Sequence, residues 1–517
     1  MPFFWWGTPS GHDFEFHVNS WMEVLSQWKQ GILYPRWAAL AHWGYGEARF
    51  LFYPPASWTL GGVLGLLLPW EIVPATYLWI VLCLAGLSMF YLARRWLDPS
   101  GAFFAAAFYA VNPYHLLIVY WRSAYAELLA AALLPILLLC ILRLEERGMK
   151  PVLCLALVLM GAWLTNAPAA VMIHYSAAVL ALCIALLQRS WRPLGKMAVA
   201  VVFGAGLAAF YLIPVAFEEK WVNIGEVLAP GVRPQDNFLF TNISDPDHNR
   251  FNLLASVIAV SEVAALTGAI VLSRAWRRTE KKPWILLTIW GAASAAAMFS
   301  STRVLWDYLP QLRFVQLPWR WLLCLNVALA ILMTIAIPRW TWRFIACAAL
   351  LAVVVIGGDR IQPPWWDTAA DIREMRDAIS DGTGYEGTDE YVPAGADPYE
   401  LQQRGPLVVA SDSTARISVS AWAPFERHLL VETHSLGLVT LRLFNYPAWK
   451  VTVNGRRVAA DTSDVTGQML IPVAPGMNDI RISFVRTRDR AIGVIVSSVS
   501  FCILLAARFI TRRTTAA

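Results

Sequence analysis

Two carboxylates and two imidazoles crowd into one short polar stretch, Ser10-Gly-His-Asp-Phe-Glu-Phe-His17. The segment that follows it, up to Trp37, repeats apolar residues at steps of four and three. Such spacing predicts a helix with one aromatic, apolar stripe and a polar back that includes Asn19, Glu23 and Gln27. We expect this helix to lie at a membrane interface, with the stripe among lipid headgroups and the polar back in water. The residues of the stripe are Phe14, Val18, Trp21, Leu25 and Trp28.

The composition is typical of a helical membrane protein with many spans. Of the 517 residues, 57% are hydrophobic and only 15% are charged, and the mean hydropathy is +0.49. The 26 tryptophans suit aromatic belts at a membrane surface better than a soluble core. The formal net charge of +6 comes from basic residues that cluster in short loops. This charge therefore indicates membrane topology, and nucleic acid is not an expected partner.

Eleven apolar runs are predicted to cross the membrane as helices. The short run 56–70 contains Gly61-Gly62 and follows Pro54-Pro55, so we interpret it as re-entrant or interfacial. Alternating the eleven spans places the basic clusters on one side, which the positive-inside pattern identifies as the cytoplasm. The stretch around Asp13 then lies outside. The predicted spans are 74–93, 101–119, 124–142, 151–167, 168–187, 195–217, 251–273, 284–300, 319–337, 341–357 and 490–509.

Near the C-terminal end of the chain the hydrophobic period changes to two. Ala415–Trp422 and Ile480–Phe484 both alternate apolar with polar residues. Asn454-Gly455 is a hairpin signal, and Pro475-Gly476 marks another turn. The sequence therefore predicts a small antiparallel β-sandwich of roughly 80 residues. A short amphipathic helix is expected before it, near residues 369–379.

The predicted fold class is mostly α: a polytopic helical membrane protein with an interfacial or re-entrant N-terminal region and a C-terminal β-sandwich. Residues 1–358 form the transmembrane domain, in which 10–37 is an acidic first outer loop. Residues 359–489 form an extracytoplasmic β-rich domain, and 490–517 form a last transmembrane helix with a cytoplasmic basic tail. This organisation predicts a multi-pass protein of the cell (inner or plasma) membrane.

Asp13 is the first candidate for chemistry. With Ser10 three positions before it, Asp13 also fits a helix capping box, which is the common structural role of this pattern. However, His12, Glu15 and His17 crowd the same few positions. So many polar groups at a membrane surface are costly unless a site uses them. A catalytic role for Asp13 and a simple helix cap are therefore the two interpretations.

Two further pairs of charged residues lie at predicted outer boundaries of the membrane. Arg122 and Glu127 flank the start of one span, where an ionisable group suggests function, although an interfacial anchor also fits. Arg313 and Arg320 flank a Pro-bent apolar segment that contains Trp319. Two guanidinium groups at headgroup depth match a lipid-linked phosphate. The alternative is that both arginines snorkel to the surface.

Several short motifs resemble those of known families. A carboxylate in the first outer loop of a polytopic protein resembles the GT-C superfamily of glycosyltransferases, which use polyprenyl-phosphate-linked sugars. The chain is more closely similar to YfhO-like bacterial membrane proteins and to membrane proteins labelled pyruvoyl-tetrahydropterin-synthase-related. The motifs that carry the similarity are Ser10–His17, Tyr34-Pro-Arg-Trp37, Gly44-Tyr-Gly46, Phe52-Tyr-Pro-Pro55, Arg122 with Glu127, Leu317-Pro-Trp-Arg320, and Tyr446–Gly455 followed by Val473–Gly476.

The chain departs from this resemblance at two places. GT-C proteins have a transmembrane helix before the first acidic loop, whereas only twelve residues precede Asp13 here. Glu47-Ala-Arg49 also stands where apolar residues are expected. The eight histidines show no three-His zinc pattern, so the pterin label predicts no function for this chain.

The resemblance implies inverting transfer of a sugar from a polyprenyl-phosphate-linked donor to an extracytoplasmic glycan or lipid acceptor. It implies Asp13 as the base, with Glu15 or Glu127 in reserve. The implied ligands of the donor phosphate are Arg122, Arg313 and Arg320. The implied supporting residues are His12, His17, Tyr34, Arg36 and Trp319. No cofactor is required and no metal ligands are assigned, although a divalent metal ion is compatible with this chemistry. Membrane lipids are further expected partners.

Two other functions stay open at the level of the sequence. A flippase or transporter of lipid-linked sugars favours charge at the bilayer midplane and an inverted repeat, whereas the charges here lie at the outer ends of spans. A non-catalytic, glycan-binding membrane scaffold would function without a base at Asp13.

Overall fold

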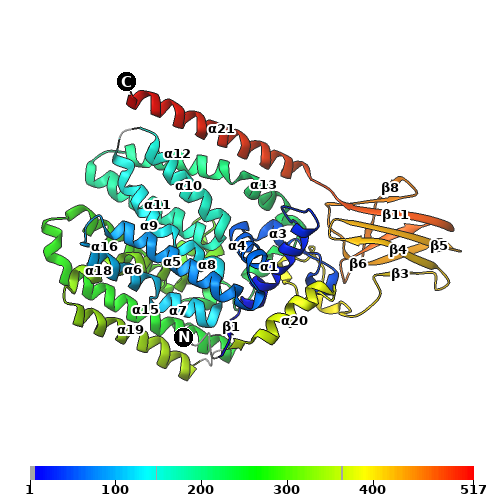
Figure 1. The fold of residues 1–517 in the computed structure, drawn as a ribbon, viewed down its shortest axis with the longest axis horizontal. Coiled ribbons are helices and arrows are strands. Elements are labelled where there is room, and N and C mark those ends of the chain that lie inside the picture. The colour runs from blue at the N-terminus through cyan, green and yellow to red at the C-terminus, as the bar shows by residue number, and fades with distance from the viewer. Residues whose placement is uncertain (1–5, 147, 362–364, 517) are drawn as a thin grey trace.

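The protein consists of a helical bundle and a smaller β domain that lie side by side (Figure 1). The computed structural model describes residues 6–146, 148–361 and 365–516, with side chains up to residue 506. Helix α1 (Phe14–Lys29) and helix α20 (Ala369–Ser380) lie between the two parts. The last helix, α21 (Arg488–Ala516), runs from the β domain back along the outside of the bundle (Figure 1).

The bundle is built from apolar helices whose facing side chains form one continuous core. Its helices are α4 (Pro55–Leu67), α5 (Val73–Ala93), α6 (Pro99–Ala110), α7 (Pro113–Leu117), α8 (Tyr125–Ala131), α9 (Leu133–Leu142), α10 (Lys150–Thr165), α11 (Ala167–Gln188), α12 (Arg192–Leu207), α13 (Ala209–Glu218), α15 (Pro246–Leu272), α16 (Lys281–Ala296), α18 (Leu322–Ala336) and α19 (Trp340–Ile361). Four short helices complete the fold, α2 (Ala41–Gly44), α3 (Arg49–Phe52), α14 (Pro234–Asn237) and α17 (Arg303–Tyr308).

In the described part of the chain, eight helices are long and apolar enough to cross a membrane, or up to ten if each of two bent pairs is one span. The bends are 76° between α12 and α13 and 93° between α16 and the segment Ser300–Tyr308. The predicted span 151–167 is the 16-residue helix α10. The eleven predicted spans thus correspond to eight long helices, two bent pairs and one shorter helix. The predicted multi-pass helical class is confirmed.

The C-terminal domain contains two antiparallel sheets, with strand orders β3-β6-β10-β9 and β4-β5-β11-β7-β8. Their inner faces share a buried core, as the predicted sandwich requires. Asn454 (φ 51) and Gly455 (φ 77) form the predicted tight turn between β7 and β8. The strands are β3 (Val408–Ala410), β4 (Arg416–Ala423), β5 (Glu426–Thr433), β6 (Gly437–Phe444), β7 (Trp449–Val453), β8 (Arg456–Val458), β9 (Asp461–Thr462), β10 (Gln468–Val473) and β11 (Gly476–Phe484).

Helix α1 is buried on its polar side as well as on its apolar stripe. Asn19 is 5% exposed, and Glu23 and Gln27 are each 1% exposed. The carboxylate of Glu23 accepts a hydrogen bond from the hydroxyl of Tyr385 (2.6 Å), and Gln27 donates to the carbonyl of Trp37 (2.8 Å). The prediction of a polar back in water is therefore wrong for these three residues, whereas Glu15 and Lys29 are exposed. Segments from distant parts of the chain cover that face and satisfy its hydrogen bonds. The prediction of a stripe among lipid headgroups is also wrong, because Phe14, Val18 and Trp21 are buried in the protein core.

Candidate functional site

The site begins where the N-terminal segment docks on the turn between α7 and α8. A π-helical turn, Ile118–Arg122, continues α7, and Ser123 follows it in the left-handed region with φ 50. The amide of Asp13 donates a hydrogen bond to the carbonyl of Arg122 (2.9 Å). The amide of Gly11 donates to Oγ of Ser123 (2.9 Å). Irregular turns of this type are frequent at functional sites, and this one fixes the backbone of Asp13 beside Arg122.

The close approach of the two backbones requires glycine at position 11. A Cβ atom at Gly11 would lie 2.3 Å from the carbonyl oxygen of Trp121. On its other side the N-terminal segment pairs as strand β1 (Thr8–Pro9) with strand β2 (Trp366–Asp367). The segment is thus held between the bundle and the chain that follows α19.

Two arginines share one buried carboxylate, that of Glu127 at the start of α8. Nη1 of Arg122 lies 2.5 Å from Oε2 of Glu127, and Nε of Arg320 lies 3.0 Å from the same oxygen. The hydroxyl of Tyr114 donates to Oε1 (2.5 Å). All three charged residues are at most 8% exposed. Two positive charges and one negative charge leave this cluster with a net charge of +1, in a place that water reaches poorly.

Asp13 lies on the solvent-exposed side of this cluster. Its Oδ2 atom lies 3.7 Å from Nη2 of Arg122, and its side chain is 42% exposed. Asp13 stands at the N-cap position of α1, yet its carboxylate caps no amide of that helix in the described residues. The capping-box interpretation therefore does not hold. The carboxylate is both partly open to solvent and close to a buried cation.

The loop before α18 positions Arg320. Its Nη1 atom donates to the carbonyl of Val315 (2.7 Å) and to Oε1 of Gln316 (3.0 Å), and Gln316 has a φ of 65. The ring of Trp319 lies 5.1 Å from the guanidinium carbon of Arg122. At 8% exposure, Arg320 does not snorkel to the surface.

Arg313, the third arginine predicted for this site, lies on the surface. Its guanidinium group contacts the ring of Phe314 at 5.0 Å. No ion pair joins it to Glu127 within the part of the chain that the structure describes. Its role as a phosphate ligand stays a prediction.

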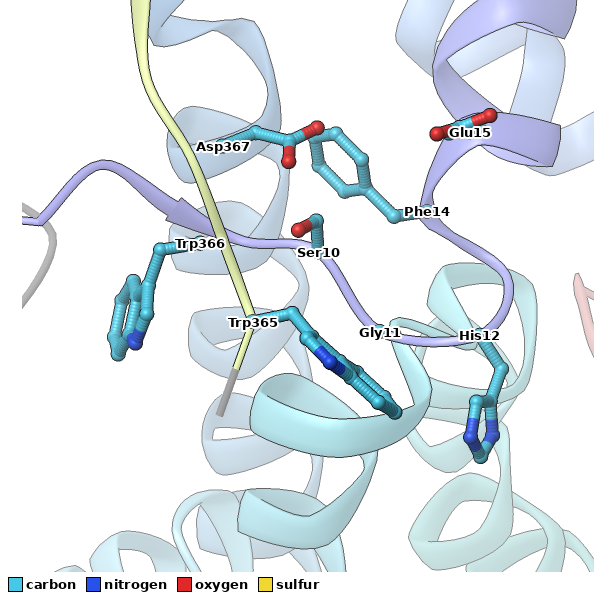
Figure 2. Close-up of a pocket in the computed structure, with 8 residues that line it drawn as sticks. All are labelled: Ser10, Gly11, His12, Phe14, Glu15, Trp365, Trp366 and Asp367. Atoms are coloured by element: carbon cyan, nitrogen blue, oxygen red, sulfur yellow. The ribbon is translucent and has the colours of Figure 1, made fainter. Parts of the chain in front are cut away.

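A cleft of about 580 Å³ opens between the N-terminal segment and strand β2 (Figure 2). Glu15 and Asp367 lie at one end of the cleft, with the ring of Phe14 between them (Figure 2). Burial and the neighbouring Asp367 raise the pKa of Glu15. Burial also raises the pKa of Asp367, although a hydrogen bond with Ser10 opposes this rise. The cleft is acidic at this end, and its charges lie close enough to repel each other.

The other end of the cleft is aromatic. The rings of His12 and Trp365 lie 5.5 Å apart, and His12 also contacts Phe251 at 5.0 Å. Sequence reasoning missed Trp365 and Asp367 because they lie in the polar stretch at the start of the predicted β-rich domain, 359–489. An aromatic pair followed by a carboxylate, Trp365-Trp366-Asp367, directly after the last helix of the bundle was the available signal.

The remaining predicted residues lie away from this cleft. His17 is buried in α1 and stacks on Tyr125 at 5.3 Å. Burial lowers the pKa of His17 to about 4, so its imidazole is neutral at pH 7. Tyr34 and Arg36 line a different cleft, of about 610 Å³, beside the β domain. In the described residues, no group of three His, Cys, Asp or Glu side chains could hold a metal ion.

The sequence matches one family model over residues 50–361, more than half of the chain. The description of that family is "6-pyruvoyl-tetrahydropterin synthase related domain; membrane protein". No curated protein matches the sequence.

Solved structures of the Archaeoglobus fulgidus oligosaccharyltransferase are similar to the chain. The apo form has a TM-score of 0.36 and 14% identity, covering 75% of this chain and 54% of that chain. The AglB complex with an inhibitory peptide and a dolichol-phosphate has a TM-score of 0.39 and 12% identity, covering 75% and 53%. A complex with Zn and sulfate has a TM-score of 0.35 and 14% identity, covering 75% and 51%. This chain thus spans about half the length of these structures.

Proposed function

This chain is a multi-pass member of the family of 6-pyruvoyl-tetrahydropterin synthase related membrane proteins, and we propose that it transfers a sugar from a polyprenyl-phosphate-linked donor to an acceptor outside the cytoplasm. One observation carries the proposal. A partly exposed carboxylate, Asp13, lies 3.7 Å from Arg122, which is itself buried in a cationic cluster. Inverting glycosyl transfer needs a base and a cation in such proximity.

The proposed step is a single displacement. Asp13 takes the proton of an acceptor hydroxyl group. The oxygen of that hydroxyl attacks the anomeric carbon of the donor sugar. The bond from that carbon to the phosphate oxygen breaks, and its electron pair leaves with the lipid phosphate. A base of this type contributes ~10²–10⁴-fold to the rate. The stereochemistry is inverted, because the acceptor and the phosphate lie on opposite faces of the sugar.

The arginine cluster supplies the positive charge that the leaving phosphate needs. Arg122 and Arg320 share the carboxylate of Glu127, and Asp13 lies 3.7 Å from Arg122. Once Asp13 has taken up the proton, these four groups carry a net charge of +1 beside the departing phosphate. Because the cluster is buried, its attraction for a phosphate is stronger than that of exposed arginines. The proposed step requires no cofactor, and a divalent metal ion is compatible with it. We assign Glu127 to positioning the two guanidinium groups rather than to proton transfer, because its carboxylate is fully engaged.

The cleft beside Asp13 suits the acceptor. Carboxylates at Glu15 and Asp367 can accept hydrogen bonds from hydroxyl groups, and the exposed ring of Trp365 offers an apolar surface for a sugar face. On this assignment the acceptor is a hydroxyl-bearing glycan or glycolipid.

Glycan profiling tests the proposed function. Envelope glycans and glycolipids are compared between cells that have the gene and cells in which it is deleted. We expect one sugar to be missing after deletion and restored by the wild-type gene. Identical profiles, under conditions in which the protein is produced, would contradict transferase activity.

A further inference from the structure

A second cleft lies where the N-terminal segment, the bundle, the β domain and helix α21 meet. It has a volume of about 610 Å³. Aromatic rings of Tyr34, Phe210 and Phe484 form part of its lining, and Val494 and Ser497 of α21 form another part. The cleft is therefore largely apolar, with polar groups at a few fixed points, as is typical of ligand sites.

Arg36 is the most unusual residue in this cleft. Its Nη2 atom donates a hydrogen bond to the carbonyl of Phe210 (3.3 Å), and its guanidinium carbon lies 4.4 Å from the ring centroid of Tyr34. Nη1 of Arg36 and the hydroxyl of Tyr34 are both buried, and neither has a hydrogen-bond partner among the described residues. Buried donors without an acceptor are costly, so this pair indicates an acceptor that comes from a ligand.

The charges around the cleft favour an anion. Arg490 forms an ion pair with Glu218, in which Nε and Nη2 of Arg490 each donate a hydrogen bond of 2.7 Å to the carboxylate. Three arginines and two carboxylates face this region, which leaves a net charge of +1. These groups are Arg36, Arg486, Arg490, Glu218 and Asp489. Arg36 makes no ion pair with either carboxylate among the described side chains, so its charge remains available.

The position of the cleft indicates an amphiphile. It opens beside the first turns of α21, whose segment Arg488–Ala506 is long and apolar enough to cross a membrane. Large apolar side chains of α21 point away from the protein: Ile492 is 52% exposed, Ile495 61% and Val499 53%. A ligand with its polar end at Arg36 would therefore have its apolar tails along a helix that faces lipid.

We propose that this junction cleft binds the phosphate group of an anionic membrane lipid. The phosphate oxygens accept hydrogen bonds from Nη1 of Arg36 and from the hydroxyl of Tyr34, and the acyl chains follow α21 past Val494. Such a lipid fixes the β domain against the bundle, because the cleft is lined by both parts. The site is separate from the Asp13 cleft, and its occupancy does not depend on sugar transfer.

Native mass spectrometry of the purified full-length protein tests this site. The protein in detergent is incubated with phosphatidylglycerol, phosphatidylcholine or inorganic phosphate. We expect the wild type to retain phosphatidylglycerol in preference to phosphatidylcholine, and inorganic phosphate to be retained weakly. Arg36→Gln should retain about tenfold less phosphatidylglycerol, because a charge-assisted hydrogen bond is lost. Arg457→Gln, at an exposed arginine of β8, is the matched control and should retain it like the wild type.

A second variant keeps the test decisive if Arg36→Gln misfolds. Val494→Trp alters only an exposed residue of α21 and fills the cleft without changing a charge, so it should also lose the lipid. Unchanged retention in folded Arg36→Gln or in Val494→Trp would overturn the proposal. Equal retention of phosphatidylcholine would overturn it as well. If inorganic phosphate is held as firmly as the lipid, the site takes free phosphate and the lipid assignment is wrong.

Discussion

Oδ2 of Asp13 lies 3.7 Å from Nη2 of Arg122, and a main-chain hydrogen bond of 2.9 Å between the same two residues holds them together. The contact joins the start of α1 to the turn between α7 and α8. It places a solvent-accessible carboxylate at the edge of a buried cluster in which Glu127 is shared by Arg122 and Arg320.

Replacing the shared carboxylate should destabilise the protein. In Glu127→Gln, two buried guanidinium groups lose their counter-charge, which should lower the free energy of unfolding by ~3–5 kcal/mol. Thermal unfolding of the purified variant measures the loss. The double variant Glu127→Gln with Arg320→Gln should recover part of the stability, because one of the unpaired charges is removed. Glu400→Gln, at an exposed carboxylate, is the control. An unfolding temperature of Glu127→Gln equal to that of the wild type would show that the carboxylate of Glu127 does not stabilise the two buried arginines.

A methyl group at position 11 should separate Asp13 from Arg122. In Gly11→Ala, the new Cβ would clash with the carbonyl of Trp121 and push the N-terminal segment away. We expect stability to fall by about 1–3 kcal/mol and sugar transfer to fall by about tenfold or more, because catalysis depends on placement. Gly268→Ala is the control, since a Cβ at Gly268 has open space around it. Transfer at the wild-type rate in Gly11→Ala would show that close docking is unnecessary.

The acidic end of the cleft should make stability depend on pH. The pKa of Glu15 is raised in the folded protein, so the folded state binds its proton more tightly than the unfolded state does. The contribution of protonated Glu15 to the free energy of unfolding is therefore fully present below the ordinary pKa of Glu15. This contribution is lost as the pH rises through the raised pKa of the folded state. Glu15→Gln removes this loss. Its unfolding temperature should exceed that of the wild type by about 1–2 °C at pH 7 and match it near pH 4. A lower unfolding temperature of Glu15→Gln at pH 7 would mean that Glu15 stabilises the fold as a carboxylate.

Much of the fold could be predicted from local patterns. The apolar runs predict the bundle because a lipid-facing helix must be apolar along its whole length. Asn454-Gly455 predicts the turn between β7 and β8 because both residues tolerate the positive φ that this turn requires. The prediction that the polar face of α1 is exposed to water is wrong because it also rests on a local pattern. A local pattern identifies a polar face but does not identify what covers it, and the hydroxyl that reaches Glu23 belongs to Tyr385.

The site was less predictable than the fold. Asp13 was singled out by the polar residues crowded around it. Arg122, Glu127 and Arg320 were singled out by their charge at the ends of spans, and the structure brings these four residues together. Tyr34 and Arg36 were grouped with Asp13 because the family resemblance implied a supporting role for them. However, the chain turns after α1 and carries them to the cleft beside the β domain. Trp365 and Asp367 were missed because only the pairing of β1 with β2 brings them to the N-terminal segment.

The rate of sugar transfer by Asp13→Asn tests the central claim most directly. Purified protein in lipid vesicles is given the lipid-linked donor and the acceptor that glycan profiling identifies, with Asp381→Asn as the control at an exposed carboxylate. The amide keeps the shape of the side chain but accepts no proton. Transfer should fall by ~10²–10⁴-fold, while the unfolding temperature and donor binding change little. A rate within about twofold of the wild type, in a folded variant, would contradict Asp13 as the base.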